Sequence, residues 1–232
     1  MLRNPSDEEL TQYSFNYLIY YKNEIEQLEN WLIASVNYPF LAGLYDLVDK
    51  RHDNDNWDLD YLKSQGFDFQ KTNFNPLAGI YPPLVSRQHE RWRLSYLKKR
   101  GHDVTTIEQA VTPLDARFRA VRDAHKDEYL HHLLFNFHNY FERFHPDHIT
   151  EDPYVFETRI CYRDTMEAIR LELEQFIDIR NELEKLQKLD ETIIRLIPES
   201  IKQRNYSPDD YIEAPPEIWW RHLEEKFGEP VD

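Results

Sequence analysis

The residues with the clearest capacity for chemistry are histidines and glutamates that recur along one stretch of the chain. The histidines are His125, His131, His132, His138, His145 and His148. Two Glu-x-x-His pairs stand among them, Glu128 with His131 and Glu142 with His145. Imidazole and carboxylate groups are common ligands for iron, zinc and manganese, and residues three apart share one face of a helix. A metal site is therefore the first chemistry to consider.

The spacing of these pairs resembles that of carboxylate-bridged di-iron bundles. Those bundles draw their two pairs from different helices, whereas both pairs here fall in one predicted helix, about 21 Å apart along its axis. On a helical wheel, Glu128, His131, His138 and Glu142 flank an apolar stripe centred on Leu130. We interpret them as a solvated or boundary face. A metal site at these four residues and a pH-responsive contact surface remain the alternatives.

A second enzymatic alternative comes from arginine and histidine spacing. Arg119 with His125, and Arg143 with His148, resemble the motif of HEPN-like helical ribonucleases. The polar residue that usually follows the family's arginine is missing at both places, and Pro146 interrupts the second. The negative charge of the chain also opposes the approach of RNA.

Two long helices are expected to position these residues. Thr112-Pro113-Leu114-Asp115 has the pattern of an N-cap followed by a proline at the first helical position, which predicts a helix over 113–145. Asp152-Pro153 repeats the pattern and predicts a second helix over 153–197, with a kink or break near 178–180. Because the connection between them is short and polar, we expect an antiparallel hairpin.

The other elements complete a predicted all-α helical bundle. A capping box at Ser6-Asp7-Glu8-Glu9 begins a long N-terminal helix that reaches about Ser35. Further helices are expected after Pro39, over 58–64 and over 83–100, the last ending at a glycine cap. A C-terminal docking helix is expected from Pro216 to about Phe227. We expect one helical domain over 1–204 and a proline-punctuated arm over 205–232.

Composition limits the partners. The chain of 232 residues has 43 acidic and 28 basic side chains and a formal net charge of -15, which disfavours nucleic acids and anionic membranes and favours a basic protein. Cys161 is the single cysteine, so neither an intrachain disulfide nor a cysteine zinc cluster can form. No apolar signal core or membrane-length segment is present in the sequence, and we expect a cytoplasmic protein without a cofactor.

Aromatic side chains supply candidate anchors for a partner. Phe74 and Tyr81 lie in an irregular segment, and Trp219 and Trp220 lie in the predicted C-terminal helix. Large aromatic side chains near a terminus or in a long loop either pack on the body or contact another molecule.

We therefore expect a non-enzymatic protein-binding module that binds or neutralises a basic protein. In composition and architecture it is similar in kind to the immunity proteins that neutralise bacterial toxins, to protein mimics of DNA and to adaptors. The rival is a helical enzyme or metal-binding bundle that uses the His/Glu stripe. A third alternative is a homodimer in which the hairpin completes a coiled coil with a second copy.

Overall fold

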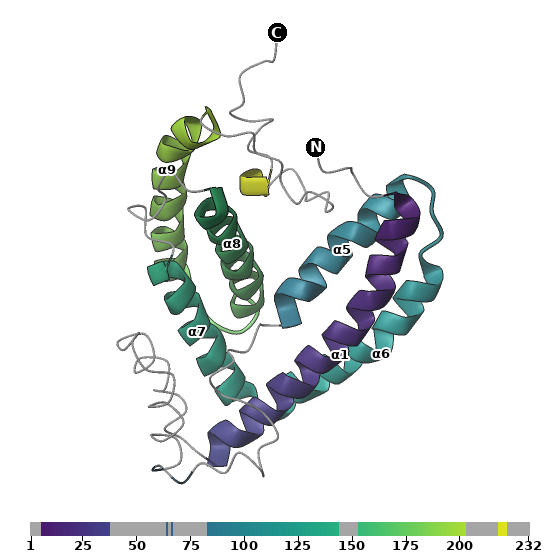
Figure 1. Ribbon diagram of the computed structural model, residues 1–232. Helices are drawn as coiled ribbons and strands as arrows, with labels where there is room; N and C mark the ends of the chain where they lie inside the picture. The colour runs from purple at the N-terminus through teal and green to yellow at the C-terminus, as the bar shows by residue number, and fades with distance from the viewer. Residues whose placement is uncertain are drawn as a thin grey trace. The chain divides into compact units, whose positions relative to one another are not determined.

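The computed structural model of the chain describes residues 6–37, 64, 66, 83–143, 153–202 and 218–221. Their regular elements are α1 (Asp7–Asn37), α5 (Pro83–Lys99), α6 (Thr105–Ala124), α7 (Lys126–Arg143), α8 (Pro153–Leu173), α9 (Arg180–Lys202) and the 3-10 helix η4 (Trp219–Arg221), drawn in Figure 1. No strand occurs in these residues. The predicted all-α class is confirmed.

Two predicted helix ends are present as local hydrogen bonds. The amide of Ser6 donates to Glu9 Oε2 at 2.6 Å and the amide of Glu9 donates to Ser6 Oγ at 3.2 Å, which is the capping box of α1. At the end of α5, Gly101 has a φ of 84°, and the amide of His102 donates to the carbonyl of Leu97 at 3.0 Å. This positive φ suits glycine, and the bond satisfies a carbonyl of the last turn.

The predicted start of the first hairpin arm is wrong. Thr112 is inside α6, where its hydroxyl donates to the carbonyl of Glu108 at 2.8 Å, and Pro113 is an interior residue. The helix begins at Thr105, whose amide donates to Asp103 Oδ1 at 2.9 Å. Buried side chains recur at helical spacing on both sides of the proline: Val104, Ile107, Val111, Phe118 and Val121. Burial of this continuous apolar stripe outweighs the local preference of proline for a first turn.

The predicted single helix over 113–145 is also divided. A turn at His125 separates α6 from α7, which begins at Lys126. The predicted break near 178–180 does occur, and Asp178 caps α9 by accepting the amide of Arg180 at 3.1 Å. However, α9 continues through Pro198 to Lys202, so its predicted end at 197 is wrong.

The chain divides into two compact units. Unit 1 comprises Met1–Tyr17, Leu84–Ile107 and Leu133–Asp232, and unit 2 comprises Leu18–Pro83 and Glu108–His132. Buried side chains of unit 1 include Leu97, Ile107, Leu133, Met166 and Ile169, and those of unit 2 include Tyr21, Ile25, Leu28, Leu32 and Tyr129. Within unit 1, α8 and α9 lie side by side and are joined by an ion pair between Arg163 and Asp190 (Figure 1).

Several predictions are not tested by this structure. The helices expected after Pro39 and over 58–64 lie outside the described residues, except Ser64, which is helical. Of the predicted C-terminal helix, residues 218–221 are described, and 219–221 form one 3-10 turn. The antiparallel pairing of the two arms and the division into 1–204 and 205–232 remain predictions.

Candidate partner-binding surface

The His/Glu stripe suggested by the sequence lies on α7. His131 and His138 are exposed and Glu128 is half-buried, while the side chain of Glu142 lies outside the described residues. No group of three or more His, Cys, Asp and Glu side chains that could hold a metal ion occurs in the described part of the chain. The described geometry therefore assigns no metal ligand at this stripe.

The buried side of α7 differs from the predicted one. The helix buries Tyr129, Leu133 and Phe137 together with His132 and Asn136. Leu130, the predicted centre of the apolar stripe, is half-buried. The predicted stripe is thus wrong by roughly a quarter of a turn. A wheel that counts only apolar residues cannot place a buried side that includes a histidine and an asparagine.

His132 is held against an aromatic neighbour within unit 2. Its ring centroid lies 4.4 Å from that of Trp31, with the rings tilted by 48°. Burial lowers the pKa of His132 to about 3, and the nearby His131 acts in the same direction. His132 is therefore neutral at pH 7 and serves as a packing residue.

The exposed apolar side chains concentrate on α1. Among the described residues, seven large hydrophobic side chains are exposed: Tyr13, Phe15, Ile19, Tyr20, Ile33, Val36 and Leu171. All but Leu171 belong to α1. Ile19 and Tyr20 are the most open, at 64% and 67% of their full exposure. Clustering of this kind on one element is typical of a contact surface.

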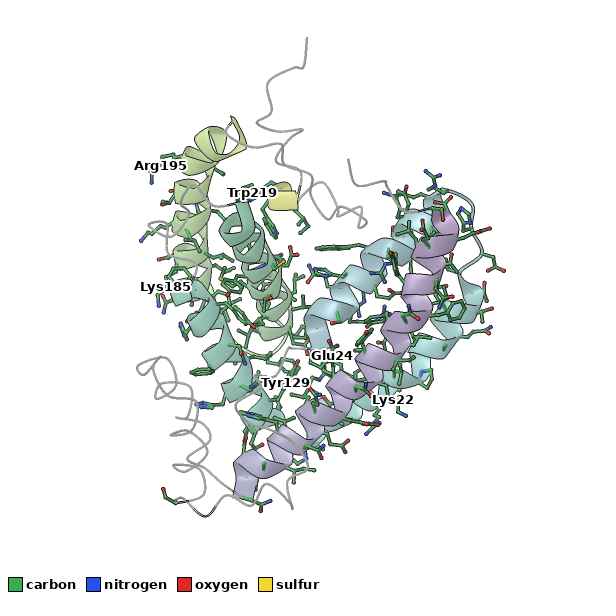
Figure 2. The ribbon with its side chains drawn as sticks, viewed as in Figure 1. Lys22, Glu24, Tyr129, Lys185, Arg195 and Trp219 are labelled. Carbon is green, nitrogen blue, oxygen red and sulfur yellow. The ribbon has the colours of Figure 1, made fainter. Side chains whose placement is uncertain are left out.

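We call the unit 2 part of this surface the α1 outer face. It consists of Ile19, Lys22, Glu26, Glu29, Ile33 and Val36. The steps of three, four and seven residues place them on one side of the helix. The other side of the same stretch is in the core and includes Tyr21, Ile25, Leu28 and Leu32. Figure 2 labels Lys22 and Glu24 on this stretch.

Ion pairs fix the centre of the α1 outer face to α6. Arg117 Nη1 donates to Glu26 Oε1 at 3.0 Å and Arg117 Nη2 donates to Glu29 Oε2 at 2.9 Å. The hydrogen bonds to Glu29 and then Glu26 raise the pKa of the Arg117 guanidinium. Close by, the hydroxyl of Tyr21 donates to Asp115 Oδ1 at 2.9 Å. The α1 outer face therefore has apolar side chains at its two ends, and between them lie Glu26 and Glu29, both paired with Arg117.

A separate hollow lies in unit 1 at the start of α1. It measures about 230 Å³ and is lined by Asp7, Glu8, Thr11, Gln12, Phe15 and His102. Arg100 Nε donates to Asp7 Oδ2 at 3.1 Å, and His102 Nε2 lies 2.7 Å from the same oxygen. Burial raises the pKa of Asp7, but the bonds to His102 and Arg100 outweigh it and hold that pKa below its ordinary value. The carboxylate of Asp7 is therefore already paired with Arg100 and His102, and it offers little charge to a ligand.

The predicted aromatic anchors that the structure describes differ in how far they are buried. Trp220 is buried within unit 1, its neighbour Trp219 is half-buried, and the two rings lie edge to face with their centroids 5.7 Å apart. Figure 2 labels Trp219. Phe74 and Tyr81 lie outside the described residues. Of the two described candidates, Trp219 is the one with surface left for a partner.

Sequence reasoning missed a buried group of charges on α8. Arg163, Asp164, Glu167 and Glu172 are all buried, and so is Glu90 on α5. The partners of Asp164 are far away in the chain, so no local spacing indicated its burial. Glu90, Glu167 and Glu172 do have partners three or four residues away, but such pairs are equally common on exposed helix faces.

No protein-family model, curated protein or solved structure matches this chain. In the part of the chain that the structure describes, no helix has both the length and the apolar character needed to cross a membrane.

Proposed function

We propose that this chain is a non-enzymatic protein-binding module and that the α1 outer face, with Tyr20 at its margin, contacts a basic protein. The observation that carries the proposal is the concentration of exposed apolar side chains on α1. Covering such side chains on association removes apolar surface from water, a favourable contribution of about 25 cal/mol per Å² from which the entropic cost of association is subtracted.

Charge supports a basic partner. Within the unit 2 stretch of α1 the acidic residues are Glu24, Glu26 and Glu29, and the one basic residue is Lys22. The whole chain has a formal net charge of -15. Charge of one sign accelerates association with a partner of the opposite sign and selects against acidic proteins. The apolar side chains would supply the affinity and the acidic ones the selectivity.

The pairing of Arg117 with Glu26 and Glu29 supports the same proposal. Two carboxylates fixed by one guanidinium lose less side-chain entropy on binding than two mobile ones. Both glutamates keep part of their surface, with 43% and 36% of their side chains exposed. A lysine or arginine of a partner can therefore approach their outer oxygens.

A cytosolic setting is part of this proposal, since a chain with Cys161 as its one cysteine suits a reducing compartment. In this setting the chain would act as an inhibitor or adaptor, in the manner of an immunity protein.

Site-specific photo-crosslinking tests the proposal. A photoreactive phenylalanine analogue replaces Tyr20 in one variant and Leu171 in another, because Leu171 is similarly apolar and 45% exposed but lies on α8. We expect irradiation in the host cell to join position 20, and not position 171, to a single basic protein. Equal capture at both positions, or capture of acidic proteins at position 20, would contradict the proposal.

A further inference from the structure

Trp220 is held by a hydrogen bond to a buried carboxylate. Its indole Nε1 donates to Asp164 Oδ1 at 2.7 Å, and Asp164 has no exposed surface. The other oxygen, Asp164 Oδ2, lies 3.0 Å from His89 Nε2 on α5. A charged acceptor makes this bond stronger than one between neutral groups.

The face of the same indole ring lies against an arginine. Arg163 Cζ is 3.8 Å from the centroid of the Trp220 ring, and Arg163 is 4% exposed. Tryptophan is the most favourable aromatic ring for a cation-π contact, and exclusion of water strengthens that contact.

The groups that hydrogen-bond this arginine lie outside the C-terminal segment. Its Nε and Nη2 donate to the two oxygens of Asp190 on α9 at 2.8 and 2.9 Å, and its Nη1 donates to Glu167 at 3.2 Å. The three hydrogen bonds of the guanidinium therefore go to α8 and α9 and none of them to η4. Arg163 and Asp164 are consecutive residues of α8. Asp164 accepts a hydrogen bond at the edge of the Trp220 ring, and Arg163 packs on the face of the same ring.

Of the segment around Trp220, the structure describes residues 218–221. The 3-10 helix η4 has three residues, Trp219–Arg221, and it packs against α8. Three residues supply at most one turn of helical hydrogen bonds, so within the described residues this segment is held to α8 chiefly by its side chains. Ile218 and Trp220 are the buried members of this segment.

We propose that this face of α8 is a tryptophan-recognition site, which the chain's own C-terminal segment fills reversibly with Trp220. The ligand class is an indole with a free N–H, offered by a polypeptide. The site selects it in two ways: Asp164 requires the N–H donor and Arg163 requires the flat aromatic face. Residues 218–221 are then a detachable strap, and their release leaves α8 and α9 folded.

Chemical rescue tests the site directly. Trp220→Ala in the full chain leaves an indole-sized space beside Asp164 and Arg163. We expect 3-methylindole at millimolar concentration to raise the melting temperature of this variant by several degrees and to leave the wild type unchanged. The matched probe 1-methylindole has the same rings but no N–H, and we expect no shift with it. Equal shifts with both probes, or none with either, would refute recognition through Asp164.

A milder variant covers the case in which Trp220→Ala does not fold. Trp220→Phe keeps an aromatic ring but removes the N–H donor. Release of residues 218–221 from α8 would give trypsin freer access to the bond after Arg221, so we expect cleavage there at least tenfold faster than in the wild type, with helix content unchanged. Trp219→Phe, at the half-buried neighbour, is the control and should keep the wild-type rate. Loss of helix content in Trp220→Phe, or an unchanged rate of cleavage, would make Trp220 an ordinary core residue.

Discussion

The guanidinium carbon of Arg163 lies 3.8 Å from the centroid of the Trp220 ring. Asp164, the next residue on α8, accepts the indole N–H of the same tryptophan, which is 56 residues further along the chain. These contacts join the C-terminal segment to α8 and α9 within unit 1. They are made from groups that are individually costly to bury and that are stable here because each has a partner.

Substitution of this arginine by lysine tests how much the planar group contributes. Arg163→Lys keeps the charge but loses the two-pronged bond to Asp190 and the flat surface against Trp220. We expect a loss of about 1–3 kcal/mol in the free energy of unfolding, measured by urea denaturation. The control is Arg180→Lys, whose side chain is 84% exposed beside Asp178. Comparable losses in both variants would remove the special role of Arg163.

Acid should weaken unit 1 through Glu167. Burial raises the pKa of this carboxyl, but Arg170 and Arg163 outweigh burial and hold the pKa below its ordinary value of 4.5. The unfolded chain therefore binds a proton more readily than the folded one. The stabilisation is complete above about pH 4.5 and is lost as the pH falls through the folded-state pKa.

Glu167→Gln removes this titration. We expect the variant to be less stable than the wild type at pH 7 and to lose less of its stability between pH 5 and pH 3, as measured by thermal unfolding. Glu184→Gln changes the same charge at an exposed position and serves as the control. A Glu167→Gln variant with the same acid sensitivity as the wild type would count against this assignment.

His132 should make unit 2 sensitive to milder acid. Its pKa is about 3 in the folded chain against 6.5 for the free side chain, so below pH 6.5 the unfolded state gains a proton that the folded state does not. The stability of the fold falls by about 1.4 kcal/mol per pH unit from this residue, beginning near pH 6.5 and ending near the folded-state pKa.

Denaturation at pH 7 and pH 5 measures this effect. The loss of stability between the two should be smaller in His132→Gln than in the wild type by roughly 2 kcal/mol. His131→Gln removes a neighbouring exposed histidine and should keep most of the wild-type loss. If both variants behave alike, the buried position of His132 does not cause the dependence.

Pro113 provides a test of the observed start of α6. An interior proline removes a main-chain donor and costs about 3 kcal/mol relative to alanine. Because Pro113 is exposed and interior, we expect Pro113→Ala to stabilise the chain by about 1–3 kcal/mol. A proline at the first helical position would give no such gain, so an unchanged melting temperature would favour the start predicted from the sequence.

These residues also show what the sequence could predict. Caps such as Ser6 with Glu9 and Gly101 are local, so their patterns located α1 and the end of α5 correctly. The pair Thr112-Pro113 has the same pattern at a helix start and inside a helix, and only the buried stripe on both sides decides between them. The helix start predicted at Pro113 was therefore wrong because four neighbouring residues do not contain the information that separates the two cases.

The candidate sites were less accessible to sequence reasoning. The acidic composition and the start of α1 were evident, but which of its aromatic and aliphatic side chains remain exposed depends on the packing of α6. Asp164, His89 and Trp220 are brought together from three elements, and no spacing in the sequence indicates that meeting.

The measurement that bears most directly on the proposed function is the affinity of the captured partner for matched surface variants. We predict that Ile19→Ser with Ile33→Ser raises the dissociation constant at least tenfold, as expected for a loss of about 1.4 kcal/mol or more, while the melting temperature is unchanged. Leu171→Ser should stay within twofold of the wild type. Equal affinity of all three proteins would contradict the assignment of the α1 outer face as the binding surface.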